Sequence, residues 1–222
     1  MKTSATNRAV PYENRHRCRG ITLIETLVVM AILAMLAMVV LPQLARRYRR
    51  ASPVSCVYEL KQISIAFRLF ATDHNDRFPQ RLSTNEGGTL EFDADVVAHF
   101  RVLSNELASP KLLVCPDDSM VPATNFTTLT ASNISYFIGM GADEMQPRMI
   151  LAGDDNLTTN NVPVGSGWLV PRTNLIVGYG KDRHGSCGNV GMSDGSAQQL
   201  TSARLEDYLR QPPNLTNRLL LP

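Results

Sequence analysis

The sequence has one apolar run long enough to cross a membrane, and it lacks a second. Hydrophobic residues make up 44% of its 222 residues, too few for a protein that spans a membrane repeatedly. Any membrane segment is therefore local. The length allows one globular domain with a real core and an appendage, but not two full domains.

The apolar run covers residues 21–41. Glu25 is its only ionisable residue, and Thr22 and Thr26 are its only other polar ones. As a helix the run is about 30 Å long, which matches the hydrocarbon core of a bilayer. A domain of this size rarely surrounds a helix that is apolar on every face. We therefore predict a membrane segment rather than a buried core helix.

The features of an ordinary secretory signal are missing after the run. Cleavage there requires small residues spaced as A-x-A. The alanines at 31, 34, 37, 45 and 51 are never two residues apart, and no lipobox cysteine follows. The run is therefore expected to stay in the mature protein.

Basic residues are concentrated at the N-terminus. The formal charge of the chain is +2, but residues 1–20 hold five basic side chains and one acidic one. The rest of the chain has 17 basic and 19 acidic side chains, a net charge of −2. Because the basic excess belongs to the first 20 residues, no nucleic-acid partner is predicted.

The start of the apolar run has a distinctive pattern. Gly20 follows an arginine, Ile21 opens the run, Glu25 is its fifth residue and Pro42 its twenty-second. This arrangement resembles the type III signal of type IV prepilins and type II secretion pseudopilins. The resemblance implies cleavage between Gly20 and Ile21 by a prepilin peptidase, N-methylation of Ile21 and a role for Glu25 in assembly.

The resemblance also implies a topology. Basic residues flank the run on both sides, so charge alone barely decides the orientation. A prepilin would have a cytoplasmic leader at 1–20, a transmembrane helix and basic membrane-exit segment at 21–52, and an exported pilin-like domain at 53–222. We therefore expect a single-pass bacterial inner-membrane protein with a periplasmic C-terminal domain and lipid contacts at the exit segment.

The helix is predicted to continue beyond the membrane. Pro42 lacks an N–H and should kink it, and Ser52-Pro53 should cap and restart it. One helix face then carries a stripe of apolar residues and ends near residue 71: Val57, Leu60, Ile63, Phe67 and Phe70.

The remainder indicates short strands. The candidates are KLLVC (111–115), SYFIG (135–139), RMILAG (148–153), TNLIVGYG (173–180) and NVGMSDGSAQQL (189–200). Asp194-Gly195 in the last segment favours a type I′ hairpin turn, and a helix is expected at about 202–210. The predicted class is α+β, with an antiparallel sheet packed on the long helix. This is also the pilin fold that the N-terminus implies.

His184, a nine-residue spacer and Asp194-Gly195 form a second pattern. It resembles the element that marks a subgroup of bacterial prepilin-like proteins. A catalytic interpretation would use His184 and Asp194, with Asp154 or Asp155, as metal ligands or as a base and its partner. The chain has no nucleophile motif and no His-rich ligand spacing, and the turn already explains Asp194-Gly195. We predict a protein that is not an enzyme, with His184 holding a loop to the sheet.

No cofactor is predicted, and calcium is the alternative. Pseudopilins often hold calcium in a C-terminal loop, and hard cations prefer oxygen ligands. The acids Asp154, Asp155, Asp182 and Asp194, with Asn156, could supply those ligands, although no EF-hand spacing is present.

The predicted exported part keeps three cysteines, Cys56, Cys115 and Cys187. In an oxidising periplasm, Cys56 and Cys115 could join the helix to the sheet, and this is the pairing we favour. The odd number leaves all three pairings open.

These observations favour a structural subunit that polymerises through its apolar helix with identical or related subunits on an inner-membrane assembly platform. Both a type II secretion pseudopilus and a type IV pilus-like filament fit. The alternatives are an anchored periplasmic domain that binds a ligand or metal without polymerising, and an anchored hydrolase.

Overall fold

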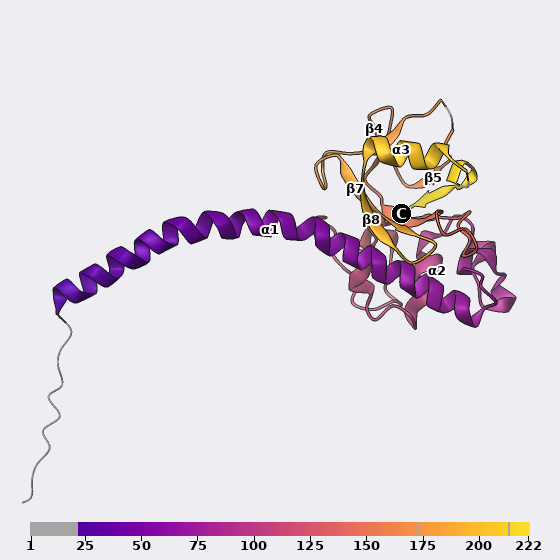
Figure 1. Cartoon of the computed structure of the whole chain (residues 1–222). Coiled ribbons are helices and arrows are strands. Elements are labelled where there is room, and N and C mark those ends of the chain that lie inside the picture. Colours follow the sequence, from indigo (N-terminus) through magenta and orange to yellow (C-terminus); the bar gives the residue numbers. More distant parts are fainter. Residues whose placement is uncertain (1–21, 173, 213) are drawn as a thin grey trace, which may run out of the picture. The chain divides into compact units, whose positions relative to one another are not determined.

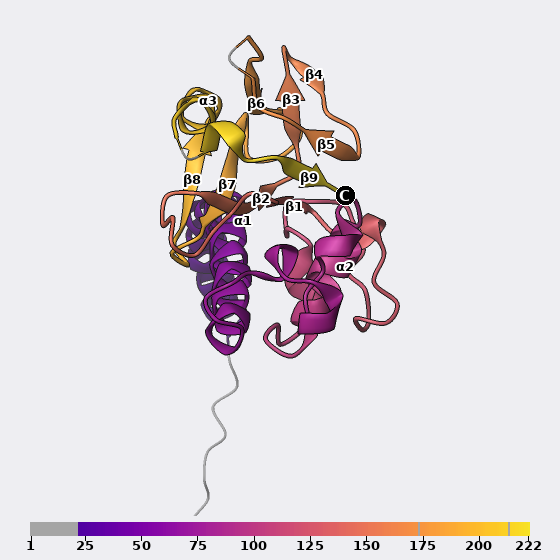
Figure 2. The same ribbon diagram turned by 90° about the vertical axis from the view of Figure 1, so that its right-hand side faces the viewer.

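The computed structural model describes residues 22–172, 174–212 and 214–222, with only the backbone described at 42–53 and 215. The chain divides into two compact units, Met1–Arg47 and Tyr48–Pro222, and each is described by itself. Helix α1 (Leu23–Asp73) begins in the first unit and ends in the second. Figures 1 and 2 together label the α-helices and the strands.

The first unit contains the N-terminal part of α1. Its segment Leu23–Leu41 has a mean hydropathy of 2.7, and none of it is buried. Leucine, alanine and methionine favour a helix here, and glycine is absent from the segment. Within the described residues, this is the one helix long and apolar enough to cross a membrane.

Helical backbone continues through both prolines of α1. The interruption expected near Pro53 is not present, and the helix ends at Asp73 rather than near residue 71. A proline removes one helical hydrogen bond, and the 51-residue helix tolerates that local loss. The bend expected at Pro42 stays a prediction.

The second half of α1 buries the predicted stripe. Leu60, Ile63 and Phe67 are fully buried, and Phe70 is 4% exposed. The Phe67 ring meets the Phe78 and Phe100 rings edge to face, with centroids 6.0 and 6.2 Å apart. These contacts join α1 to the segment that follows it.

That segment consists of short helices. Asp95 caps α2 (Val96–Arg101) by accepting hydrogen bonds from the N–H groups of Val97 and Ala98. The 3₁₀ helices are η1 (Pro79–Arg81), η2 (Thr84–Glu86), η3 (Leu90–Phe92), η4 (Val102–Ser104), η5 (Pro110–Leu113) and η6 (Ala131–Asn133). The strand predicted at 111–115 is wrong, because Pro110 opens η5 and the Ser109 hydroxyl accepts the N–H of Lys111.

The main sheet has six strands in the order β5-β9-β1-β2-β7-β8, all paired antiparallel. Their bounds are β1 (Tyr136–Gly139), β2 (Ile150–Asp154), β5 (Gly167–Leu169), β7 (Cys187–Met192), β8 (Ala197–Thr201) and β9 (Leu219–Leu221). A three-stranded sheet has the order β4-β3-β6, with β3 (Leu157–Thr159), β4 (Val162–Pro163) and β6 (Val177–Tyr179). Helix α3 (Ser202–Arg210) matches the predicted closing helix, and η7 covers Asn214–Thr216.

The main sheet lies between two apolar layers. Alternate residues of β1 point to opposite faces, so Tyr136 and Ile138 join the core beside α1 while Phe137 joins the core beneath α3. Figure 2 shows the second half of α1 and α2 on one side of this sheet and α3 with the three-stranded sheet on the other. A side chain at Gly191 of β7 would overlap Ser64 of α1, so this glycine allows the strand to approach the helix closely. The α+β class with an antiparallel sheet packed on the long helix is confirmed, and the fold is pilin-like.

The hairpin predicted at Asp194-Gly195 joins β7 to β8, but its turn is not type I′. Gly195 has φ +83°, whereas Asp194 is outside the left-handed region that a type I′ turn requires. The N–H of Gly195 donates to the Met192 carbonyl over 3.0 Å, and the N–H of Met192 donates to the Ser196 carbonyl over 2.8 Å. The ladder stops at the Gly191 and Ala197 pair. The connection between β7 and β8 is therefore longer than a two-residue type I′ turn: it is a type I turn followed by a glycine bulge at Gly195.

Candidate functional site

The N-terminal candidate site is only partly described, because Gly20 and Ile21 lie outside the described residues. Glu25 lies in the first turn of α1 and is exposed. Its carboxylate accepts the N–H and the hydroxyl of Thr22, both at 3.4 Å, and its own N–H donates to the Thr22 carbonyl at 3.1 Å. Thr22 and Glu25 therefore form a capping pair at the helix start. The T-x-x-E spacing could have revealed this pair from the sequence.

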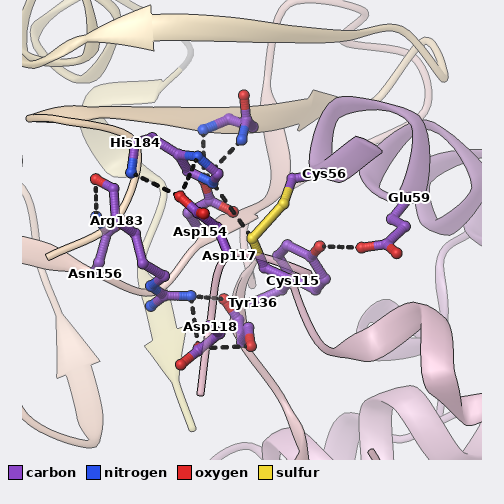
Figure 3. The surroundings of a disulfide bond; sticks show 12 residues. Cys56, Glu59, Cys115, Asp117, Asp118, Tyr136, Asp154, Asn156, Arg183 and His184 are labelled. Atoms are coloured by element: carbon purple, nitrogen blue, oxygen red, sulfur yellow. Dashed lines mark hydrogen bonds and ion pairs between the residues drawn. A yellow bond between two sulfur atoms is a disulfide. The ribbon is translucent and has the colours of Figure 1, made fainter. Parts of the chain in front are cut away.

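A second candidate site lies at the contact between α1 and the main sheet. A disulfide joins Cys56 of α1 to Cys115, just after η5, with Cα atoms 5.4 Å apart. Both cysteines are fully buried, and Cys187 is free. This is the pairing favoured from the sequence. Figure 3 shows the bond with His184 and Asp154 beside it; these four residues are called the Cys–His–Asp cluster below.

His184 reaches the cluster from a tight loop before β7. His184, Gly185 and Ser186 all have positive φ, of 52°, 63° and 68°, and the His184 side chain is fully buried. Its Nε2 lies 3.3 Å from Sγ of Cys115 and 3.4 Å from Oδ2 of Asp154. Burial lowers the pKa of His184, although the Asp117 carboxylate opposes the shift. The imidazole is therefore neutral at pH 7, and it holds the loop against the sheet.

Asp154 ends strand β2 and is fully buried. Its Oδ2 accepts two hydrogen bonds from Asn189 of β7, from the backbone N–H at 2.8 Å and from Nδ2 at 2.9 Å. Its Oδ1 is buried with no hydrogen-bond partner. Burial raises the pKa of Asp154 to about 7, although the Asn189 N–H and Arg183 oppose the shift. A buried acid with an unpaired oxygen marks a polar centre in an apolar layer.

Arg183 forms a charge network beside the cluster. Its guanidinium pairs with Asp118 over 2.9 Å and also with Asp155, and the side chains of all three are 10–13% exposed. Asp118 further accepts the Ser135 hydroxyl at 2.8 Å. Burial lowers the pKa of Arg183, but the carboxylates outweigh it and the net shift is upward. The guanidinium fixes the His184 loop to the end of β2.

Another acid, Glu59, lies on the α1 side of the site. The hydroxyl of Tyr136 on β1 donates to Oε2 of Glu59 over 2.9 Å. Burial raises the pKa of Glu59 to about 7, opposed by this hydrogen bond and supported by the charge of Asp154. Glu59, which is half-buried, and Asp154, which is fully buried, therefore both have a pKa raised to about 7.

The structure does not bring the four acids proposed as calcium ligands together at one point. Asp154 and Asp155 adjoin, but their carboxylates have different partners, Asn189 and Arg183. Asp182 is exposed and lines a cavity of about 580 Å³. Asp194 lies in the hairpin loop after the C-terminal end of β7, whereas His184 lies before its N-terminal end. Oδ1 of Asp194 accepts the N–H of Ser196 at 2.8 Å. Among the described residues, the group with metal-binding donors close together is Cys56, Cys115 and His184.

Sequence reasoning missed several residues of this region. Arg183, Asp118, Glu59, Tyr136 and Asn189 were not predicted. The signals present were the acid pair directly after the apolar strand 148–153 and the acid pair of CPDD (115–118) after Cys115. Acids next to buried apolar segments are seldom left without a cation or donor, so both pairs indicated a buried partner such as Arg183.

Replacing Arg183 with methionine is expected to destabilise the second unit by about 3 kcal/mol, because Asp118 and Asp155 would face each other nearly buried and without a cation. The free energy of unfolding can be measured by urea titration of the detergent-solubilised chain, followed by the fluorescence of its single tryptophan, Trp168. The matched control is Arg77→Met, because the Arg77–Glu86 pair is 42% and 50% exposed and should contribute less than about 1 kcal/mol. Equal effects of the two changes would contradict the structural role of Arg183.

Comparison with known proteins adds one match. Neither the curated proteins nor the solved structures gave a match to the chain. The family model described as the prokaryotic N-terminal methylation motif matches residues 15–41. That range contains Gly20, Ile21 and Glu25 and ends with the exposed apolar segment of α1. The chain therefore carries a prepilin-type N-terminal methylation motif on a long apolar helix, followed by a pilin-like α+β domain.

Proposed function

We propose that the chain is a structural subunit of a pilus-like filament, cleaved after Gly20, N-methylated at Ile21 and assembled through α1. One observation carries the proposal: the methylation motif at 15–41 coincides with a helical segment that is apolar and exposed over Leu23–Leu41. Burying apolar surface is worth roughly 25 cal/mol per Å². Before assembly, membrane lipid would bury the apolar segment Leu23–Leu41. After assembly, the helices of neighbouring subunits would bury it.

The proposal covers a type II secretion pseudopilus and a type IV pilus-like filament, which share this N-terminus. Its partners are a prepilin peptidase, identical or related subunits, an inner-membrane assembly platform and membrane lipid. Residues 1–20 are the cytoplasmic leader, 21–52 the membrane helix with its basic exit segment, and 53–222 the periplasmic domain. The Cys56–Cys115 disulfide supports export, since disulfides persist in oxidising compartments.

A membrane-anchored ligand-binding domain is the second candidate. The cavity of about 580 Å³ favours it, because polar and charged side chains line part of it: Thr158, Asn161, Lys181, Asp182 and Ser202. Such a domain would keep its function without polymerising. Deleting the apolar helix would then leave ligand binding intact, whereas a filament subunit would lose its role.

The processing step can be tested by intact mass and N-terminal peptide mapping of the chain from cells with and without the matching peptidase. We expect a mature chain that starts at N-methylated Ile21 only where the peptidase is present. A Gly20→Val variant is the control and should keep its leader, because a branched side chain replaces the glycine before the scissile bond. Retention of Met1 in the wild-type chain, or a cut near residue 45, would overturn the proposal.

A further inference from the structure

We propose that the exposed side of α1 in the second unit binds a second copy of this chain, at a different surface that lies around η3. The first surface, called the α1 outer face below, consists of Val54, Tyr58, Lys61, Ile65, Arg68 and Leu69. The second surface, called the η3 patch, consists of Leu90, Glu91, Phe92, Asp93 and Asp95. The inference rests on the proposed filament function and names the surfaces by which the folded domains of neighbouring copies would meet.

The α1 outer face is apolar where a surface helix is usually polar. Val54 is 69% exposed, Tyr58 63%, Ile65 41% and Leu69 52%. Their spacings of four, seven and four residues put them on one side of the helix, about half a turn from the buried stripe between Leu60 and Phe70. A helix on a domain surface usually has charged and polar residues on that side. Four large, exposed apolar side chains in one row therefore indicate an interaction surface.

The α1 outer face also provides a cation. Arg68 is already engaged, because its guanidinium pairs with Glu144 over 3.2 Å and donates to the Asp194 carbonyl at 2.9 Å. Lys61 is exposed and lies in the middle of the apolar row. Among the described side chains of this row, Lys61 is therefore the cation available to a partner, so the partner surface should be apolar and acidic.

The η3 patch has this complementary composition. Leu90 and Phe92 are 51% and 48% exposed. Acids follow them in the sequence: Glu91, Asp93 and Asp95. Arg218 pairs with Asp93 over 3.1 Å and is the cation beside the patch. The three acids outnumber it, so the patch is negative overall and opposite in sign to Lys61.

The two surfaces lie at opposite edges of the main sheet. A side chain at Gly195, in the hairpin between β7 and β8, would come within 3.2 Å of Arg68, so the α1 outer face borders the β8 edge. Asp93 pairs with Arg218, whose guanidinium lies 4.4 Å from the ring centroid of Trp168 on β5. Strands β8 and β5 are the two edge strands of this sheet, and Figure 2 shows them far apart. The two surfaces therefore cannot meet within one chain.

This placement makes the contact heterologous. Each copy would use its α1 outer face on one neighbour and its η3 patch on another. Such contacts give closed rings when the rotation between copies closes and open helical filaments when it does not. A contact of the α1 outer face with itself would stop at a two-fold dimer and bring two lysines of the same sign together. Charge complementarity therefore favours the η3 patch of a second copy as the occupant.

The test is cross-linking between full-length chains in cells that contain the matching peptidase. Serine replaces the two cysteines outside the disulfide, Cys18 and Cys187. In this background, Leu69→Cys and Leu90→Cys place one thiol on each surface, and a short bis-maleimide joins thiols that lie close together. We expect no dimer from either variant alone and a dimer when the two are produced together. A chain that carries both changes should give a ladder of dimers, trimers and longer products.

Charge variants test the role of Lys61. Lys61→Glu in the Leu69→Cys chain should lower the yield of mixed dimer roughly two- to fivefold, because repulsion from the η3 patch replaces attraction. Glu91→Lys in the Leu90→Cys chain should restore much of that yield. The matched control is Lys181→Glu, which should leave the yield unchanged. Lys181 is exposed and lines the cavity beside the three-stranded sheet, on the other side of the main sheet. Circular dichroism reports whether each variant folds.

Intact mass and sedimentation separate the failure of this contact from the failure of the filament function. Processed chains that sediment as assemblies but give no mixed dimer would overturn the contact and leave the filament proposal in place. Efficient dimers from the Leu69→Cys chain alone would assign the α1 outer face to a contact with itself, which also overturns the inference. Chains that are neither processed nor assembled would overturn both proposals.

Discussion

Changing Glu25 to leucine or glutamine is expected to leave cleavage after Gly20 largely intact and to stop filament assembly. Cleavage depends on the residues at the scissile bond, whereas Glu25 lies five residues beyond Gly20 in the first turn of α1. Intact mass would report processing, and sheared surface filaments or sedimented assemblies would report polymerisation. Normal filaments from the leucine variant would contradict the proposed role.

The physical reason is the cost of an isolated charge in a membrane. An ionised acid near the centre of a bilayer costs about 2.5 to 3.5 kcal/mol on insertion scales, so an acid in this segment indicates function. If the chain is cleaved after Gly20 as proposed, Ile21 gains an α-amino group four residues before Glu25 in the sequence. We expect that amine, on a neighbouring subunit, to pair with the Glu25 carboxylate and set the position of one subunit against the next.

The capping pair provides a competing explanation that variants can separate. Glu25 accepts the N–H and hydroxyl of Thr22, so its loss could act by fraying the helix. Glu25→Gln keeps a capping acceptor and loses the charge, whereas Thr22→Ala loses the cap and keeps the charge. We expect the glutamine variant to fail in assembly and the alanine variant to assemble. The opposite pattern would assign Glu25 to helix capping instead.

The elements with regular, local patterns could be predicted from the sequence. The stripe from Leu60 to Phe70 repeats every three or four residues, and that spacing requires one buried helix face. The helix at Ser202–Arg210 has a threonine cap and two buried leucines at the same spacing, Leu205 and Leu209. The α+β class followed from these helices and from the short apolar runs between turns.

Elements that depend on distant partners were not predicted. Strand β9 consists of three leucines near the C-terminus, and it becomes a strand because it pairs with both β5 and β1. The segment 111–115 is apolar enough for a strand, yet Ser109 and Pro110 direct it into a 3₁₀ helix. Non-local pairing makes β9 a strand, whereas local capping outweighs β propensity at 111–115.

The candidate site shows the same division. His184 and the Cys56–Cys115 pair were visible as residue types, but their meeting with Asp154 depends on four separate segments: α1, the end of η5, β2 and the loop before β7. The His184 and Asp194 spacing in the sequence does not reflect contact between these residues. It reflects the length of strand β7, which begins after the His184 loop and ends in the hairpin that contains Asp194.

Removing the disulfide with Cys56→Ala and Cys115→Ala is expected to lower the free energy of unfolding by about 4 kcal/mol. The bond spans 59 residues, and the chain-entropy estimate for a loop of that length is about 4 kcal/mol at 25 °C. The loop links α1 to the end of η5, so the unfolded chain would regain freedom over the whole helical segment between them. For a domain of this size the melting temperature should fall by roughly 8 to 16 °C.

The double variant isolates the covalent bond better than either single change, because no unpaired thiol remains in the core. Urea titration under oxidising conditions, followed by Trp168 fluorescence, gives the free energy of unfolding. Cys187→Ala is the matched control, since Cys187 is free and only partly buried, and it should change stability by less than about 1 kcal/mol. If the double variant and the control unfold at the same urea concentration, the bond is not a main constraint on this fold. A loss confined to the double variant would show that fixing α1 to the segment after η5 depends on this bond as well as on the apolar stripe.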